Sequence, residues 1–135
     1  MNDLRLCLEW ARGTGGLAPY FEGLGAGIAR ATCCPGCHRT WFPPRLACTC
    51  GRVELQWRTL PGSGIVRAVT AGPGRLPGEE PTRTLVLALV AVEGADNAVL
   101  GRIEPPIAPA VGAGVRLIAD TLRGRPAWSA VFTPC

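Results

Sequence analysis

Lysine is absent from this 135-residue sequence, and all fourteen basic residues are arginine. With ten acidic residues the formal net charge is only +4, well short of the charge of a polycationic nucleic-acid binder. Arginine suits two-pronged contacts with phosphates and carboxylates, although the abundance of Gly, Ala, Pro and Arg is at least as well explained by genomic base composition. We therefore expect one small domain, or one small domain with a metal-stapled appendage.

Long apolar runs are also missing, because no stretch approaches the roughly eighteen uninterrupted apolar residues that span a bilayer. Residues 1–5 lack the basic start and apolar stretch of a signal peptide. We therefore expect a cytoplasmic protein without a membrane partner. Histidine occurs once, as His38 beside the cysteine cluster, and neither Cys7 nor Cys135 has an evident partner. Because a nucleophile needs a positioned base, we expect no independent catalysis.

Cysteine is plentiful by contrast, and five of the seven cysteines lie within residues 33–51. The spacing of Cys34 and Cys37 lets one tight turn direct two thiolates at a single ion, and Cys48 with Cys50 supplies a second pair. In a reducing cytosol such a cluster favours metal ligation over disulfides or free buried thiols. We predict a structural zinc site with four sulfur ligands and no open coordination position.

Two features of this cluster depart from the usual zinc knuckle, which reads Cys-x-x-Cys-Gly. His38 stands where the first glycine is expected, and the pair Cys48 and Cys50 is one residue short. A Cys-x-Cys pair chelates only with a sharper turn. Cys33 is therefore an alternative to Cys34, and His38 is an alternative to Cys50.

Residue patterns predict a mainly β protein with two short N-terminal helices. The helices are expected at residues 3–12, where the apolar residues share a face, and at about 19–24. Five strands are expected, of which the first is strongly bent and runs from 53–60 through a bend into 65–70, and the others are 84–92, 98–103, 115–121 and 127–132. The resulting organisation is a helical segment at residues 1–30, a zinc ribbon at 31–56 and a five-stranded OB-fold (oligonucleotide/oligosaccharide-binding) barrel at 57–135.

Finer patterns give four further expectations. Gly62 and Gly64 indicate a bulge or a tightly coiled corner. Residues 71–83 form a long loop, and 84–92 form a strand buried on both faces. Glu93 and Asp96 lie near the following turn, where we expect solvated carboxylates.

The order of these motifs resembles the DUF35 family, whose acyl-CoA-associated members join a rubredoxin-like zinc ribbon to an OB fold. The resemblance covers about residues 19–133, and the Phe-Pro-Pro-Arg stretch between the cysteine pairs is its most specific part. The matching residues are Cys34, Cys37, Phe42, Pro43, Pro44, Arg45, Cys48, Cys50, Gly51, Trp57, Gly62, Gly64 and Thr70. Later, residues 89–94 and 112–115 fit the family's central strand and a turn before a strand.

The resemblance implies a non-catalytic accessory subunit of a thiolase-like acyltransferase complex, with a barrel that covers or extends the path of a CoA thioester. Guanidinium groups bind the phosphates of CoA well, and Arg45, Arg67 and Arg83 are the expected acyl-CoA contacts. For Arg45, a role in bracing the ribbon against the barrel is about equally expected. We place partner docking on five apolar residues of the N-terminal segment, namely Leu4, Leu8, Trp10, Tyr20 and Phe21.

The alternative function is a nucleic-acid-binding module, because zinc ribbons and OB barrels both occur in such proteins. Barrels that bind single strands present aromatic side chains within a basic groove. The expected strands 84–92 and 98–103 carry no aromatic residue, so this function is not favoured.

Overall fold

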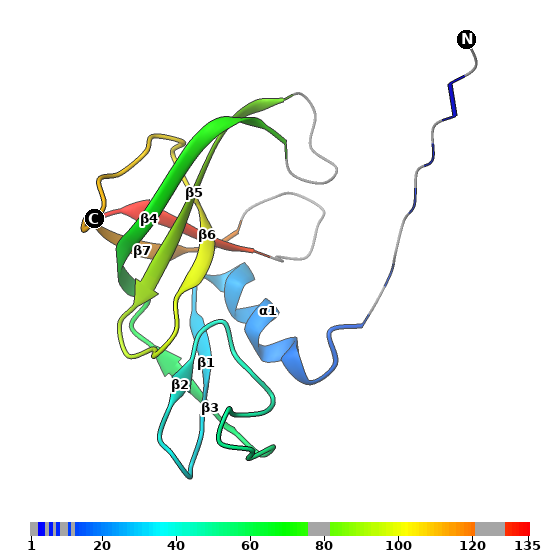
Figure 1. The fold of residues 1–135 in the computed structure, drawn as a ribbon, viewed down its shortest axis with the longest axis vertical. Coiled ribbons are helices and arrows are strands. Elements are labelled where there is room, and N and C mark those ends of the chain that lie inside the picture. Colours follow the sequence, from blue (N-terminus) through cyan, green and yellow to red (C-terminus); the bar gives the residue numbers. More distant parts are fainter. Residues whose placement is uncertain are drawn as a thin grey trace.

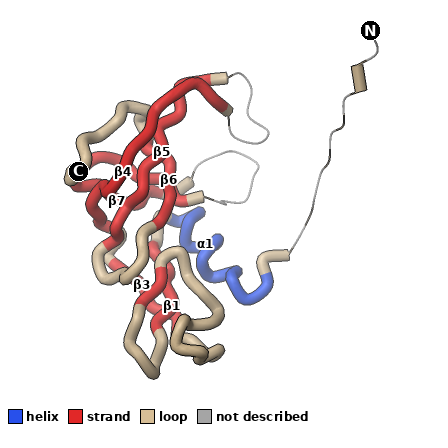
Figure 2. The backbone as a smooth tube through the Cα atoms, in the orientation of Figure 1, coloured by secondary structure: helices blue, strands red, loops and turns tan. Residues whose placement is uncertain are grey.

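The computed structural model describes residues 3, 4, 6, 8, 11, 13–75, 82–120 and 129–135 (Figure 1). Strand dominates the described chain (Figure 2), so the predicted mainly β fold is confirmed. Its elements are η1 (Gly15–Leu17), α1 (Ala18–Ala26), β1 (Ala29–Cys33), β2 (Thr40–Trp41), β3 (Gln56–Leu60), β4 (Ser63–Gly74), β5 (Arg83–Val92), β6 (Val99–Ile103), β7 (Gly114–Ile118) and β8 (Ala130–Pro134). No helix among the described residues is long and apolar enough to cross a membrane.

Helix α1 corresponds to the helix predicted at 19–24. It has Pro19 in its first turn, where a missing N–H costs no helical hydrogen bond, and it ends at Gly27 in a left-handed conformation (φ 72°). Gly23 lets the helix lie close to the chain that follows it, because a Cβ there would meet the carbonyl oxygen of Ile28 at 2.6 Å. The helix therefore turns directly into β1.

The prediction of a helix at 3–12 is wrong for the residues described there, because none of them is helical. The side chains of Leu4 and Leu8 are 84% and 73% exposed, whereas Trp10 lies outside the described residues. Isolated helices of this length are marginal in water unless an apolar face is packed. Nothing in the described part of the chain covers these leucines.

A three-stranded antiparallel sheet of order β2-β1-β3 carries the ribbon. Strand β1 pairs along its whole length with β3, from Ala29 opposite Leu60 to Cys33 opposite Gln56. Residues 53–60 were expected to lead into the barrel as its first strand. Instead β3 belongs to the ribbon sheet, and the turn after Leu60 passes the chain to β4.

The barrel is closed in the order β4-β5-β6-β8-β7, with β7 pairing back onto β4. All neighbours are antiparallel except β6 and β8, which are parallel. The OB-type barrel is thus confirmed. The bulge lies between Val66 and Ala68, not at Gly62 or Gly64.

Strands β4 and β5 form a long hairpin, paired as far as Gly74 opposite Arg83. The loop predicted at 71–83 is therefore wrong over residues 71–74, which are strand. Residues 76–81, and the turn predicted at 123–126, lie outside the described residues.

The principal core fills the barrel and continues under α1. Phe132 and Ile103 are fully buried in the barrel, and Gly101 makes room for the Phe132 ring, which a Cβ would meet at 2.6 Å. The ring of Tyr20 packs edge-on against Phe42, with 5.7 Å between centroids. Helix, ribbon and barrel consequently share one apolar cluster.

Candidate metal centre

The first cysteine turn connects β1 to β2. The Cys34 backbone N–H donates to the Arg39 carbonyl at 2.8 Å, and the His38 N–H donates to the Cys34 carbonyl at 2.9 Å. His38 adopts a left-handed conformation (φ 63°), which is uncommon outside glycine but is several-fold enriched in histidine. His38 therefore serves the backbone role that glycine has in the usual knuckle.

The second cysteine turn is closed in the same way although it is one residue shorter. The Cys48 N–H donates to the Arg52 carbonyl at 2.8 Å, and the Gly51 N–H donates to the Cys48 carbonyl at 3.0 Å. Gly51 has φ 98°, a conformation that glycine adopts without steric cost. This sharp turn directs the Cys50 side chain towards the first cysteine pair.

The four thiol sulfurs form one cluster. Cys34 Sγ lies 3.6 Å from Cys50 Sγ, and Cys37 Sγ lies 3.4 Å from Cys48 Sγ. All four lie within 4.8 Å of one another, too far apart for disulfide bonds of about 2.05 Å. Sulfurs around a tetrahedral ion with metal–sulfur bonds of about 2.3 Å are about 3.8 Å apart. The four cysteines therefore fit a single metal ion.

The two alternative ligands do not join this cluster. The thiol of Cys33 faces the carbonyl oxygens of Cys34 and His38, at 3.9 Å from each. Cys33 is the last residue of β1, and its sulfur is not part of the group of cysteine sulfurs that lie within 4.8 Å of one another. Among the described residues, the group that could hold a metal ion is Cys34, Cys37, Cys48 and Cys50.

The protein environment shifts the pKa values of Cys34, Cys37 and Cys48 in different directions. The backbone N–H of Cys50 lowers the pKa of the Cys48 thiol to about 6, against the effect of burial. The backbone N–H of Cys37 lowers the pKa of Cys34. At Cys37 the N–H of Arg39 lowers the pKa, but the Cys48 thiol, burial and the other thiols outweigh it and raise the pKa to about 11. Two thiols are thus prepared to bind a cation, whose charge favours deprotonation of the rest.

A small satellite core surrounds the cluster, where Cys34, Trp41 and Cys48 are buried and Leu55 packs against them. The guanidinium of Arg45 lies over the Trp41 ring, 4.6 Å from its centroid. The backbone of Arg45 is also held, because its N–H donates to Thr32 Oγ1 and its carbonyl accepts from the same hydroxyl. The exposed Arg45 thus connects the loop after β2 to Thr32 of β1 and to Trp41.

A polar clamp joins the ribbon to the barrel. The Thr40 N–H donates to the Asp96 carboxylate at 2.8 Å, while the Asp96 N–H donates to the Thr40 carbonyl at 2.7 Å. Asn97 accepts from the Phe42 N–H at 2.7 Å and donates to the Pro43 carbonyl at 3.2 Å. Sequence analysis expected Asp96 to be solvated, which is wrong. The available signal was an Asp-Asn pair at a turn, whose side chains readily bond backbone groups.

The other two predicted acyl-CoA arginines lie apart. Arg67 is exposed at the bulge of β4, and Arg83 begins β5, where its guanidinium pairs with Glu104 at 3.1 Å. Arg83 lies opposite Gly74, seven residues beyond Arg67 on β4. At about 3.4 Å per residue this is roughly 23 Å along the strand. The fold does not gather these arginines at one position.

The predicted docking aromatics are engaged within the chain. Tyr20 is buried, and Phe21 packs against the same core. Their rings meet edge-on, with 5.1 Å between centroids. Leu4 and Leu8 are exposed, as described above.

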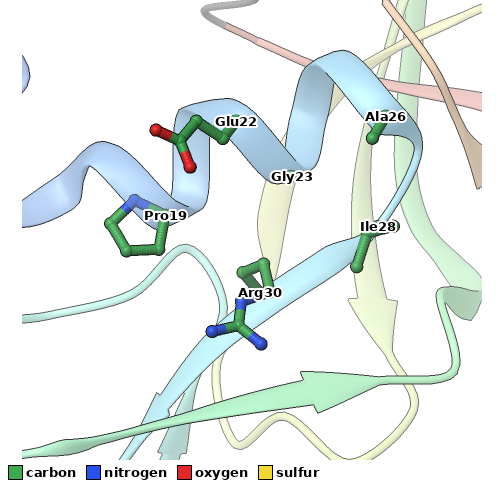
Figure 3. A pocket seen from close by; sticks show the side chains of 6 residues that line it. All are labelled: Pro19, Glu22, Gly23, Ala26, Ile28 and Arg30. Carbon is green, nitrogen blue, oxygen red and sulfur yellow. The ribbon is translucent and has the colours of Figure 1, made fainter.

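A shallow groove of about 380 Å³ lies between α1 and β1 (Figure 3). Its walls are mostly small or apolar, and Glu22 and Arg30 are its charged residues. The Arg30 guanidinium donates to Thr59 Oγ1 at 2.8 Å. The described residues that line the groove include no nucleophile with a neighbouring base.

Comparison with known proteins identifies the fold. No protein-family model matches the chain, and no curated protein matches its sequence. A chain of the structure named Ltp2-ChsH2(DUF35) aldolase superposes with a TM-score of 0.69 at 24% identity, covering 93% of this chain and 98% of that one. A DUF35-family protein of unknown function from Sulfolobus solfataricus gives 0.64 at 18% identity, covering 90% and 87%. The resemblance to DUF35 is confirmed at the level of the fold.

Proposed function

We propose that this chain, which has the fold of the DUF35 proteins, is a non-catalytic accessory subunit of a thiolase-like acyltransferase complex. In this role it supports assembly and lets an acyl-CoA, or the acyl group it carries, reach the partner's active site. The supporting observation is the likeness to a chain of the Ltp2-ChsH2(DUF35) aldolase, a match that extends over nearly the whole of both chains.

We further propose that the metal is a structural zinc ion. Four thiolates suit zinc, which is commonly bound in tetrahedral sites of this composition. Cys34, Cys37, Cys48 and Cys50 would hold it, and a site filled by four protein ligands supplies folding energy instead of Lewis-acid chemistry. Its contribution would be to fix the ribbon, and through Asp96 and Asn97 the ribbon's position on the barrel.

For the acyl-CoA, Arg67 is the strongest of the three arginine candidates. Its side chain is exposed. Arg45 is also exposed, but its guanidinium lies over the Trp41 ring, and Arg83 pairs with Glu104. A free guanidinium can bind a CoA phosphate in two-pronged fashion. Arg67→Ala should weaken acyl-CoA binding to the assembled complex, and Arg58→Ala, an exposed arginine of the ribbon sheet, is the matched control.

The test is affinity purification of the tagged chain from its own cells, with mass identification of co-purifying proteins and metal analysis of the same sample. The proposal predicts a stoichiometric thiolase-like protein and one zinc per copy of this chain. The acyl-transfer or retro-aldol activity of that protein should fall when this chain is removed and return when it is added back. Recovery of nucleic acid, or of this chain alone, would contradict the proposal.

A further inference from the structure

The outer face of strand β5 is apolar along its length. Side chains alternate across a strand, so Leu85, Leu87, Leu89 and Ala91 share the face that points away from the barrel core, whereas Val86, Ala88, Val90 and Val92 are buried inside. An antiparallel strand with one solvated face normally carries polar residues there. The prediction that this strand is buried on both faces is wrong for the isolated chain, since Leu89 is 39% exposed.

Neighbouring strands extend this face into a continuous apolar strip. Leu89 lies opposite Ala68 of β4 and Leu100 of β6, and Ala91 lies opposite Ile65. Ile65 and Leu100 are 46% and 62% exposed. Figure 1 shows β4, β5 and β6 side by side, as their pairing requires. We call Ile65, Ala68, Leu87, Leu89 and Leu100 the apolar strip.

The strip is hollowed in the middle. A depression of about 150 Å³ is lined by Ala68, Val69, Thr70, Leu87, Leu89 and Leu100. The strip differs from the other exposed apolar side chains, such as Val53 of the ribbon, because its members are contiguous in the sheet. Contiguous exposed apolar residues mark interaction sites, whereas scattered ones are normal. The lining is aliphatic and not aromatic, which suits a protein surface and not stacked bases.

The rim of the strip is basic. Arg67 is exposed at the bulge beside Ile65 and Ala68, and Arg116 is exposed on β7 opposite Ser63. Glu93 lies at the same end and accepts a hydrogen bond from Ser63 Oγ at 2.8 Å. Two arginines against this one carboxylate leave the rim with a net positive charge. A second copy of this chain would bring an arginine rim against the same arginine rim. A different protein with an aliphatic surface and an acidic rim is the complementary partner.

A buried ion network limits the far end of the strip. Arg102 lies opposite Leu87, yet its side chain is only 6% exposed. Its Nε lies 3.1 Å from Glu104, and its Nη2 lies 3.5 Å from Asp120. Where β5 faces Arg102 of β6, the apolar strip therefore ends at Leu87. In the opposite direction along β5 it continues towards Ile65 of β4.

We propose that the apolar strip is the surface on which this chain docks its partner subunit, through aliphatic contacts, with Arg116 against acidic residues at its border and Arg67 left for the acyl-CoA. This inference rests on the proposed function, since it names the surface through which the accessory subunit joins its complex. The proposed docking surface therefore lies on the barrel, and it replaces the docking surface predicted from the sequence at the N-terminal residues and Tyr20–Phe21.

The test uses the thiolase-like protein recovered by affinity purification, produced separately and titrated with this chain. Leu89→Glu and Leu100→Glu should each weaken binding by about thirtyfold or more, the effect of an interface hot spot. Val53→Glu is the matched control, an equally apolar and 73% exposed residue of the ribbon, and should leave the Kd unchanged. Each variant's circular dichroism and melting temperature should match wild type, because the side chains are exposed.

Different outcomes separate this inference from the proposed function. If wild type binds the thiolase-like protein and both strip variants bind equally well, the strip inference is overturned while the proposed function stands. If wild type binds no such protein, the proposed function and this inference both fail. If sedimentation of the isolated chain reveals a dimer that Leu100→Glu dissociates, a second copy occupies the strip, and the inference is overturned in that direction.

Discussion

In the ribbon, the buried residues around the cysteines are Cys34, Trp41 and Cys48, with Leu55 packed beside them. In the barrel, by contrast, apolar side chains from every strand interlock around Phe132. The ribbon buries too little apolar surface to offset the entropy of ordering its two turns. The closed five-stranded barrel buries enough apolar surface to offset the entropy of ordering its chain. We therefore expect metal chelation to hold the two cysteine turns of the ribbon, whereas hydrophobic burial holds the barrel.

The largest expected effect is the loss of a metal ligand. Cys34→Ser should abolish stoichiometric metal binding, because apparent zinc-binding free energies of about 10–16 kcal/mol drive the folding of comparable small sites. Amide hydrogen exchange should then accelerate in β1 and β2 while β5 stays protected. Cys33→Ser is the adjacent control and should keep one metal per chain. Equal metal loss in both variants would show that Cys33 takes part in the site.

The complementary change is made inside the barrel. Phe132→Ala should lower the free energy of unfolding by about 3–5 kcal/mol, as removal of a buried Phe side chain does, because Phe132 is fully buried. Denaturant titration of the metal-loaded protein measures this loss. Metal content should not change in the folded variant. A destabilisation below about 1 kcal/mol would mean that the barrel is not held by this core.

An intermediate effect is expected at the clamp between the two parts. Asp96→Ala removes the acceptor of the Thr40 N–H, and leaving such a group unsatisfied costs about 1–3 kcal/mol. Metal removal by a chelator should destabilise the barrel less in this variant than in wild type, because the connection is weakened. Glu93→Ala, which removes a bond to Ser63 within the barrel, is the control. Identical chelator responses in Asp96→Ala and wild type would contradict the role of the clamp.

The smallest effect is expected at His38. His38→Gly should keep one metal per chain, and relief of the left-handed backbone should stabilise the ribbon by at most about 1 kcal/mol. Metal stoichiometry and thermal unfolding of the ribbon measure both. A loss of metal in this variant would identify His38 as a ligand after all.

Features set by local spacing were predictable from the sequence. The cluster of four cysteines follows from two short cysteine pairs, and the barrel strands follow from apolar runs separated by turn residues. The helix α1 is likewise predicted by Pro19 at its start and by Gly27 at its end. These signals act within a few residues, so one sequence suffices to read them.

Features that depend on pairing between distant segments were not predictable in this way. Strand β3 pairs with β1 in the ribbon, where Trp57 lies opposite Thr32, and no local pattern distinguishes that sheet from the barrel. The clamp of Asp96 on Thr40 joins residues 56 apart. The sequence shows only that strand 84–92 is apolar on both faces. Which of the two faces is covered depends on how the whole chain folds.

The most direct test of the central claim is native mass spectrometry of the complex purified through this chain. The proposed function predicts a single assembly containing a thiolase-like subunit, this chain and one zinc ion per copy of it. Leu100→Glu should remove the thiolase-like subunit from the spectrum while the zinc-bound chain remains. A spectrum in which wild type appears only as the free chain would contradict the account.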